Sequence, residues 1–194
     1  MPATTPALPW DLPSFRIRRK VLKLFGASFH VYDGERVVAF CDQKAFKLRE
    51  DIRLYHDETK SKELMLIRAR QVIDFAACYD IVDAASQQKV GALRRKGLAS
   101  ILRDSWEVLD NDDKPLGKCQ EDSAAMAMLR RFINLIPQTF RLQAPQGGAV
   151  VFKQRFNPFV YSLEVTIPAD VGIDRRLVFA TAVLLAAIEG RQQS

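Results

Sequence analysis

The residues best suited to binding chemistry are arginines and lysines that lie two positions apart on short, strand-like segments. Alternate residues of a strand project from the same face, so each pair would point its charges in one direction. Neighbouring strands lie about 4.8 Å apart, so pairs on adjacent strands would form a compact phosphate-binding patch. The candidate anion-binding residues are Arg68, Arg70, Arg94, Lys96, Lys47 and Arg49.

A similar row occurs nearer the N-terminus, where Arg16, Arg18 and Lys20 alternate along one segment. The alternative for all these basic residues is a solvated outer wall, because many acidic residues accompany them in the sequence. Those acidic residues include Glu50, Asp51, Glu63 and Asp74. The sequence does not establish which strands are neighbours, so both interpretations stay open.

Catalytic patterns are weaker. His30 and His56 are the only histidines, and His56 lies beside Asp57 and Glu58, as acid–base chemistry would require. The same residues also make an ordinary polar turn. The sequence contains no phosphate-binding glycine loop, dinucleotide-binding loop, nucleophile elbow or His-Glu-x-x-His pattern. We therefore predict no enzymatic activity and no cofactor.

The segment that starts at Asp110 opens like a calcium-binding loop, with Glu121 at its twelfth position. An EF-hand loop needs an oxygen ligand at the fifth position and glycine at the sixth, where Lys114 and Pro115 stand here. We therefore predict a hairpin turn and no metal site.

Composition places the chain among ordinary globular proteins, since 48% of its 194 residues are hydrophobic and 27% are charged. Cys41, Cys78 and Cys119 are far apart and odd in number, which predicts buried free thiols in a reducing cytosol.

No secretory leader and no membrane-spanning apolar run are evident. The net charge of +6 favours anionic partners. We expect a cytoplasmic location, with peripheral association at the inner membrane surface left open.

The N-terminal residues 1–14 contain four prolines, which predict an extended strap whose Trp10 docks on the body of the protein. Residues 15–194 are expected to form one domain. Strand periodicity is clearest at its far end, where Tyr161, Leu163, Val165 and Ile167 alternate with polar residues.

Three segments within this domain share one pattern: an aromatic, a polar, an aliphatic and an apolar residue, then Asp and a turn into a returning strand. They begin at Phe29, Tyr79 and Trp106. The aromatic residue and the aliphatic residue two positions later would share the core face. A fourth hairpin is expected over residues 52–67. Repeated hairpins indicate a meander that curls into a sandwich or barrel.

Two helices interrupt the strands. The first is expected over residues 123–136, with Arg130 and Arg131 on its polar face. The second lies near 174–190, with Asp174 as its N-cap and Gly190 as its C-terminal stop. Its residues 177–188 are apolar on every side, which predicts complete burial. At about 18 Å it is too short for a hydrocarbon layer of about 30 Å, so we expect a closed antiparallel β-barrel that encloses this helix.

With these features the sequence resembles the tubby-like C-terminal domains, which include phospholipid scramblases and plant LURP-one-related proteins. Apart from the apolar C-terminal helix, the matching segments are 21–26, Tyr32-Asp33, 44–51, 69–74, 79–81, Val90-Gly91, 95–97 and Trp106. Together they cover nearly the whole chain from Phe15. The resemblance implies a barrel of about twelve strands around a central helix.

The resemblance also implies a function. Tubby domains bind phosphoinositide headgroups through basic side chains on the barrel wall, and scramblases associate with membranes in a calcium-dependent manner. Residues 168–174, just before the C-terminal helix, offer only two carboxylates, and there is no cysteine-rich palmitoylation stretch. These departures argue against scramblase activity.

We therefore expect a non-enzymatic module that binds anionic phospholipid or phosphoinositide headgroups at a membrane surface. The alternative is a protein-interaction domain that uses the proline-rich strap or the helix face carrying Arg130 and Arg131. A small-ligand carrier or enzyme ranks third, because the central helix would fill the barrel. Nucleic acid is not an expected partner, because the aromatic residues fall at core positions of strands.

Overall fold

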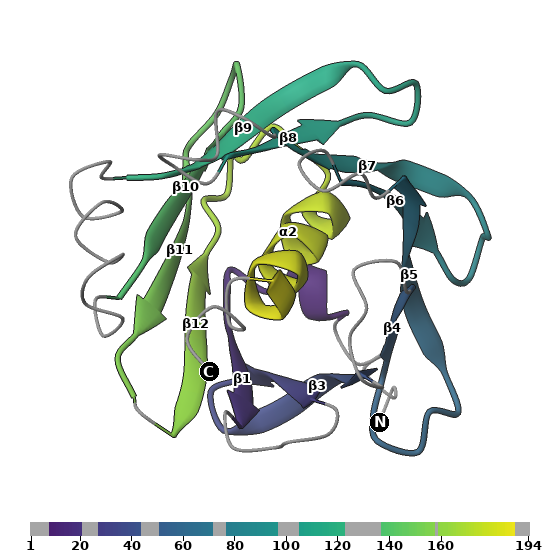
Figure 1. Ribbon diagram of the computed structural model, residues 1–194, viewed down its shortest axis with the longest axis vertical. Helices are drawn as coiled ribbons and strands as arrows, with labels where there is room; N and C mark the ends of the chain where they lie inside the picture. The colour runs from purple at the N-terminus through teal and green to yellow at the C-terminus, as the bar shows by residue number, and fades with distance from the viewer. Residues whose placement is uncertain are drawn as a thin grey trace, which may run out of the picture.

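Twelve strands and two helical segments make up the described part of the chain, which in a computed structural model comprises residues 8–20, 27–43, 51–71, 77–96, 105–122, 137–157 and 159–188 (Figure 1). The strands are β1 (Ser14–Lys20), β2 (Ala27–Asp33), β3 (Arg36–Gln43), β4 (Ile52–Tyr55), β5 (Glu63–Gln71), β6 (Cys78–Asp83), β7 (Lys89–Arg95), β8 (Ser105–Leu109), β9 (Pro115–Glu121), β10 (Thr139–Gln143), β11 (Val150–Arg155) and β12 (Val160–Thr166). The helical segments are the 3-10 turn η1 (Pro9–Asp11) and the helix α2 (Arg175–Ile188).

Each strand pairs antiparallel with the next, and β1 closes the barrel by pairing with β12. This seam is regular from the pair Ser14 and Thr166 to the pair Lys20 and Val160. Closure matters because it leaves no strand edge unpaired. Figure 1 shows α2 inside the ring of strands. The prediction of a closed antiparallel barrel of about twelve strands around a C-terminal helix is confirmed.

Alternation along the strands fills the barrel interior. In the first of the three repeats, Phe29 and Val31 are buried, and His30 between them projects outward. The other two repeats bury the corresponding side chains, which are Tyr79, Ile81, Trp106 and Val108. The core face predicted for all three repeats is therefore confirmed.

The helix α2 is buried at every position from Leu177 to Ile188, as its apolar surface requires. The single hydroxyl in this stretch, on Thr181, donates to the backbone oxygen of Leu177 at 2.8 Å. The wall approaches the helix closely at Gly91, where an added Cβ would lie 3.0 Å from the Leu177 side chain and 2.3 Å from the Leu109 oxygen. Among the described residues, no helix has the length and apolar character needed to cross a membrane.

One end of the barrel, which we call the strap end, is closed where η1 meets the start of α2. Trp10 is buried there and packs edge-on against Phe179, with ring centroids 6.0 Å apart. Arg175 donates to the backbone oxygens of Trp10 at 2.9 Å and Leu12 at 2.6 Å. The docking predicted for Trp10 is thus present.

The same end holds the first turn of α2. Asp174 accepts a hydrogen bond from the Arg176 backbone N–H at 2.8 Å, which confirms the predicted N-cap. The Arg176 side chain then bridges to Asp83, 3.3 Å away at the end of β6. The helix start is therefore tied both to the strap and to the wall.

The three cysteines are free thiols. Cys41 and Cys119 are buried as predicted, but Cys78 is only half-buried. Its position on β6 explains the difference: Tyr79 points into the core, so Cys78 points outward. Partial burial raises the pKa of the Cys78 thiol.

Several predicted features lie outside the described residues. They are the helix over 123–136 with Arg130 and Arg131, the stop at Gly190, residues 1–7 of the strap, and the basic pair Lys47 and Arg49.

Candidate functional site

Four of the predicted anion-binding residues occupy the outer face of the barrel between β5 and β8. Arg68 and Arg70 lie on β5, Arg94 lies on β7, and Lys96 follows that strand. The two pairs are not on adjacent strands, because β6 runs between them and places Asp80 directly opposite Arg68. We call this face the paired wall; its cations are Arg68, Arg70, Lys89, Arg94 and Lys96.

Arg70 is the most heavily paired of these cations. Its guanidinium binds both carboxylate oxygens of Asp80 and reaches Asp113 in the β8–β9 turn at 2.8 Å. Lys89 binds the same Asp113 at 2.8 Å. Hydrogen bonds from Arg70 and then Lys89 hold the pKa of Asp113 far below its ordinary value. The Asp113 carboxylate is therefore ionised and held by these two cations.

Glu107 on β8 plays the same part for the other pair. Arg94 lies 2.7 Å and Lys96 2.5 Å from its carboxylate oxygens. Burial alone would raise the pKa of Glu107, but hydrogen bonds from Lys96 and Arg94 outweigh burial and lower it. Arg68 has a looser contact, 3.9 Å from Asp51. Each predicted cation that the structure describes therefore faces a carboxylate.

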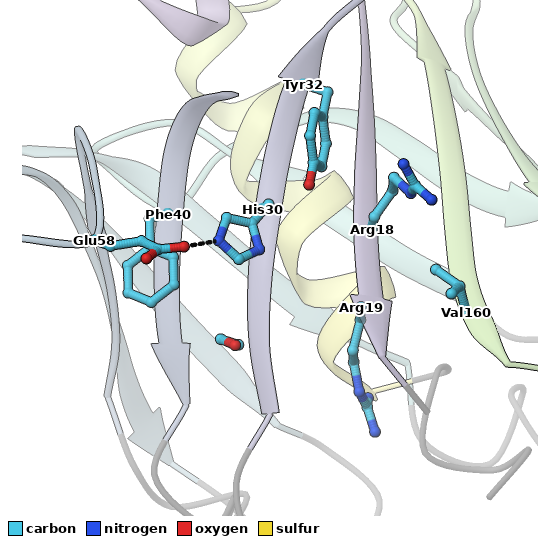
Figure 2. Close-up of a pocket in the computed structure, with 8 residues that line it drawn as sticks. Arg18, Arg19, His30, Tyr32, Phe40, Glu58 and Val160 are labelled. Carbon is cyan, nitrogen blue, oxygen red and sulfur yellow. Dashed lines mark hydrogen bonds and ion pairs between the residues drawn. The ribbon is translucent and has the colours of Figure 1, made fainter. Parts of the chain in front are cut away.

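A second surface lies across β1, β2 and β3, where the outer wall is indented (Figure 2). This outer hollow has a volume of about 430 Å³. It is lined by Arg18, Arg19, Ser28, His30, Tyr32, Phe40, Glu58 and Val160. Six of these eight residues come from β1, β2 and β3; Glu58 comes from the β4–β5 turn and Val160 from the start of β12.

Strand register creates this cluster. Arg18 on β1 lies directly opposite His30 on β2, and Arg16 lies opposite Tyr32. All four project outward, because the intervening Ile17 and Val31 are buried in the core. The Arg18 guanidinium lies over the Tyr32 ring, 5.6 Å from its centroid. A cation at this distance from an aromatic face is favourably placed.

The charges of the outer hollow differ from those of the paired wall. The one carboxylate among its described lining residues, Glu58, is bound to His30 at 2.5 Å. Within the described residues, Arg18 has no carboxylate partner. Arg19 is buried and lies over the Phe29 ring at 5.9 Å. The Arg18 guanidinium and the Ser28 and Tyr32 hydroxyls thus offer hydrogen-bond donors to an anion.

Part of this site was within reach of the sequence. Alternation had already placed Arg16 and Arg18 on one face, and the Phe29 repeat places His30 and Tyr32 outward. Two facts were missing: the register of β1 against β2, and the contact of His30 with Glu58, which lies 28 positions away. Neither leaves a local pattern in the sequence.

The segments that start at His56 and at Asp110 both form turns in which an aspartate side chain accepts hydrogen bonds from backbone N–H groups. Asp57 accepts hydrogen bonds from the backbone N–H and hydroxyl of Thr59 at 2.9 and 2.5 Å, and His56 lies 3.3 Å from it. Asp110 accepts backbone hydrogen bonds from Asp112 at 2.9 Å and Lys114 at 2.8 Å. Among the described residues, no three His, Cys, Asp or Glu side chains converge as metal ligands would.

In a comparison with protein families, a family model described as LURP-one-related fits residues 37–186. Searches of curated proteins and of solved structures returned no match. The family match covers well over half of the chain, and its span runs from β3 to the last turns of α2. The chain therefore belongs to the LURP-one-related family, within the tubby-like superfamily.

Proposed function

We propose that this protein is a non-enzymatic binding module for anionic lipid headgroups, of the phosphoinositide kind, at a membrane surface. The observation that carries the proposal is the outer hollow, where Arg18 lies over the Tyr32 ring and has no carboxylate partner in the described residues. The Ser28 and Tyr32 hydroxyls line the same hollow. An arginine guanidinium matches a phosphate group well, because two parallel N–H groups bind two phosphate oxygens.

The absence of competing carboxylate partners around Arg18 in the described residues favours the outer hollow over the paired wall as the phosphate site. On the paired wall, a phosphate would first have to displace Glu107 from Arg94 and Lys96, or Asp113 from Arg70 and Lys89. In the hollow, the Arg18 guanidinium exchanges only water and a ring contact for the phosphate. The residues predicted from sequence on the paired wall stay a prediction, and they make a natural comparison.

The overall charge supports the same proposal. A net charge of +6 draws the barrel toward an anionic surface from a distance. Each basic side chain near such a surface contributes about 1 kcal/mol, and salt weakens this attraction. Long-range attraction alone does not fix how the barrel is oriented on the membrane. A headgroup site on the outer wall would fix that orientation.

Co-sedimentation with vesicles tests the proposal through a matched pair of variants. Arg18→Ala and Arg94→Ala each remove one outer-wall arginine and leave the same net charge. We expect wild-type binding to vesicles of phosphatidylserine and phosphoinositide, and none to neutral phosphatidylcholine. Arg18→Ala should weaken binding about 5- to 10-fold, because it removes both a charge and a bidentate contact, whereas Arg94→Ala should weaken it less than about 2-fold.

Three other results would each say something definite. Equal small losses in both variants would mean that net charge, not a headgroup site, drives binding. A larger loss for Arg94→Ala would locate the site on the paired wall. No wild-type binding at low or physiological salt would refute the lipid proposal and favour a protein partner.

A further inference from the structure

The β11–β12 connection carries two large apolar side chains that face water. Phe156 is 56% exposed and Phe159 is 64% exposed, more than any other large hydrophobic side chain in the described residues. The Asn157 side-chain oxygen accepts hydrogen bonds from the backbone N–H groups of Phe159 at 2.9 Å and Val160 at 3.0 Å. These hydrogen bonds tie the backbone of Phe159 and Val160 to the Asn157 side chain. We call Phe156 and Phe159 the aromatic tip.

Exposed apolar residues are common on folded proteins, so their surroundings decide whether they are informative. Here the aromatic tip is continuous with the outer hollow, because Val160 follows Phe159 and lines the hollow. Val160 also lies opposite Lys20, the last residue of β1, so the tip lies at the barrel end opposite the strap end. The two features share one side of the molecule.

Basic residues lead from the wall to the tip. Lys153 and Arg155 lie on β11 just before Phe156, and both project outward beside buried Phe152 and Gln154. Arg155 pairs with Glu164 at 2.8 Å. Within the described part of the chain, Lys153 has no carboxylate partner, and nor does Arg18 in the neighbouring hollow. The apolar tip is thus flanked by uncompensated positive charge.

This combination matches the interface of an anionic bilayer. Phenylalanine side chains of peripheral proteins are buried at the boundary between headgroups and acyl chains, and basic residues beside them bind lipid phosphates. Stable attachment of a peripheral protein needs two such signals, since one alone gives only marginal binding. A protein partner for the rings would leave the adjoining positive charge unexplained.

We propose that the aromatic tip inserts into the interfacial layer of an anionic membrane while the outer hollow holds a headgroup. The barrel then docks with the strap end pointing away from the bilayer. This inference rests on the proposed function, because it assumes that the outer wall meets anionic lipid. It adds a membrane-inserting element and an orientation that headgroup binding alone does not require.

The test compares two variants on the same phosphatidylserine–phosphoinositide vesicles. Phe156→Ser/Phe159→Ser removes the aromatic tip. Leu8→Ser is the control, because this side chain is 37% exposed and directly precedes η1 at the strap end. We expect the tip variant to bind about 10-fold more weakly, because serine lacks the favourable free energy that a phenylalanine ring gains on leaving water. The control should bind like wild type.

A second measurement reads insertion directly. In a Phe159→Trp variant, the introduced indole reports on the tip, while Trp10 and Trp106 stay buried in the core. Its emission should shift to shorter wavelength on anionic vesicles and be quenched by lipids brominated near the headgroup.

The outcomes separate this inference from the function on which it rests. If wild type binds, Arg18→Ala weakens binding, and the tip variant binds normally with no indole shift, then the insertion is refuted and the headgroup site stands. If wild type ignores anionic vesicles, both proposals fall. If the tip variant loses affinity as much as its strap-end control does, the effect is not specific to the tip and the insertion is refuted.

Discussion

The paired wall and the outer hollow are built from the same parts and differ in what their cations face. Both place arginines at outward positions of antiparallel strands. On the paired wall, Arg70 binds two carboxylates and Glu107 binds two cations. In the outer hollow, Arg18 lies over the Tyr32 ring.

The spacing of basic residues along a strand therefore does not reveal which of them are already paired with carboxylates. A guanidinium that already binds carboxylates has had its desolvation compensated, so a phosphate gains little by replacing them. A guanidinium without such partners keeps its hydrogen-bonding capacity for a ligand. We therefore propose that the paired wall stabilises the barrel and that the outer hollow binds the headgroup.

The largest effect is expected from removing the support that the paired wall and the outer hollow share. The helix α2 touches the paired wall at Gly91 and the β1 wall through Phe15, whose ring lies 5.1 Å from that of Phe179. Gly91→Ala would force a Cβ within 2.3 Å of the Leu109 oxygen. We expect a destabilisation of about 3 kcal/mol, measured by urea unfolding, and a joint loss of headgroup binding as the barrel unfolds.

Gly34→Ala is the control for that substitution. Gly34 has a φ of +59° and open space where a Cβ would be, so only the backbone preference costs energy, about 1 kcal/mol. If Gly91→Ala unfolded the paired wall and left the hollow binding headgroups, the two walls would be independent units and the comparison would need another basis.

A smaller effect separates the walls by stability and pH. Arg70→Ala should destabilise the protein by about 1 kcal/mol at pH 7, because it removes contacts to the Asp80 and Asp113 carboxylates. The pKa of Asp113 is lowered in the folded state, so this stabilisation is present above the ordinary carboxyl pKa and is lost as pH falls through the folded value. The difference from wild type should therefore shrink below about pH 4.

Arg18→Ala is the corresponding substitution in the outer hollow. Removing this guanidinium breaks no ion pair among the described residues, so unfolding at pH 7 should change by less than about 0.5 kcal/mol. A destabilisation equal to that of Arg70→Ala would contradict the proposal that the paired wall stabilises the barrel and the outer hollow binds the headgroup.

The sequence predicted the fold better than the site, for a physical reason. Strands such as the one with Tyr79 and Ile81, and the helix at 177–188, reveal themselves by periodic burial, which is a local property. Whether a charge is compensated depends on contacts between distant segments. Arg70 meets Asp113 from 43 positions away, and Arg18 meets no carboxylate in the described residues. No local pattern carries that information.

The smallest expected effect comes from a substitution that frees two cations of the paired wall from their carboxylate. Glu107→Gln removes the carboxylate shared by Arg94 and Lys96 and leaves a side chain of nearly the same shape. The freed cations should then behave like Arg18, and affinity for anionic vesicles should rise about 3-fold at low salt, because one more positive charge lies near the surface. Glu164→Gln is the matched control for net charge, since Glu164 pairs with Arg155 alone. An equal rise in both variants would mean that total charge governs binding; a rise confined to Glu107→Gln would show that ion pairing is what keeps the paired wall from binding.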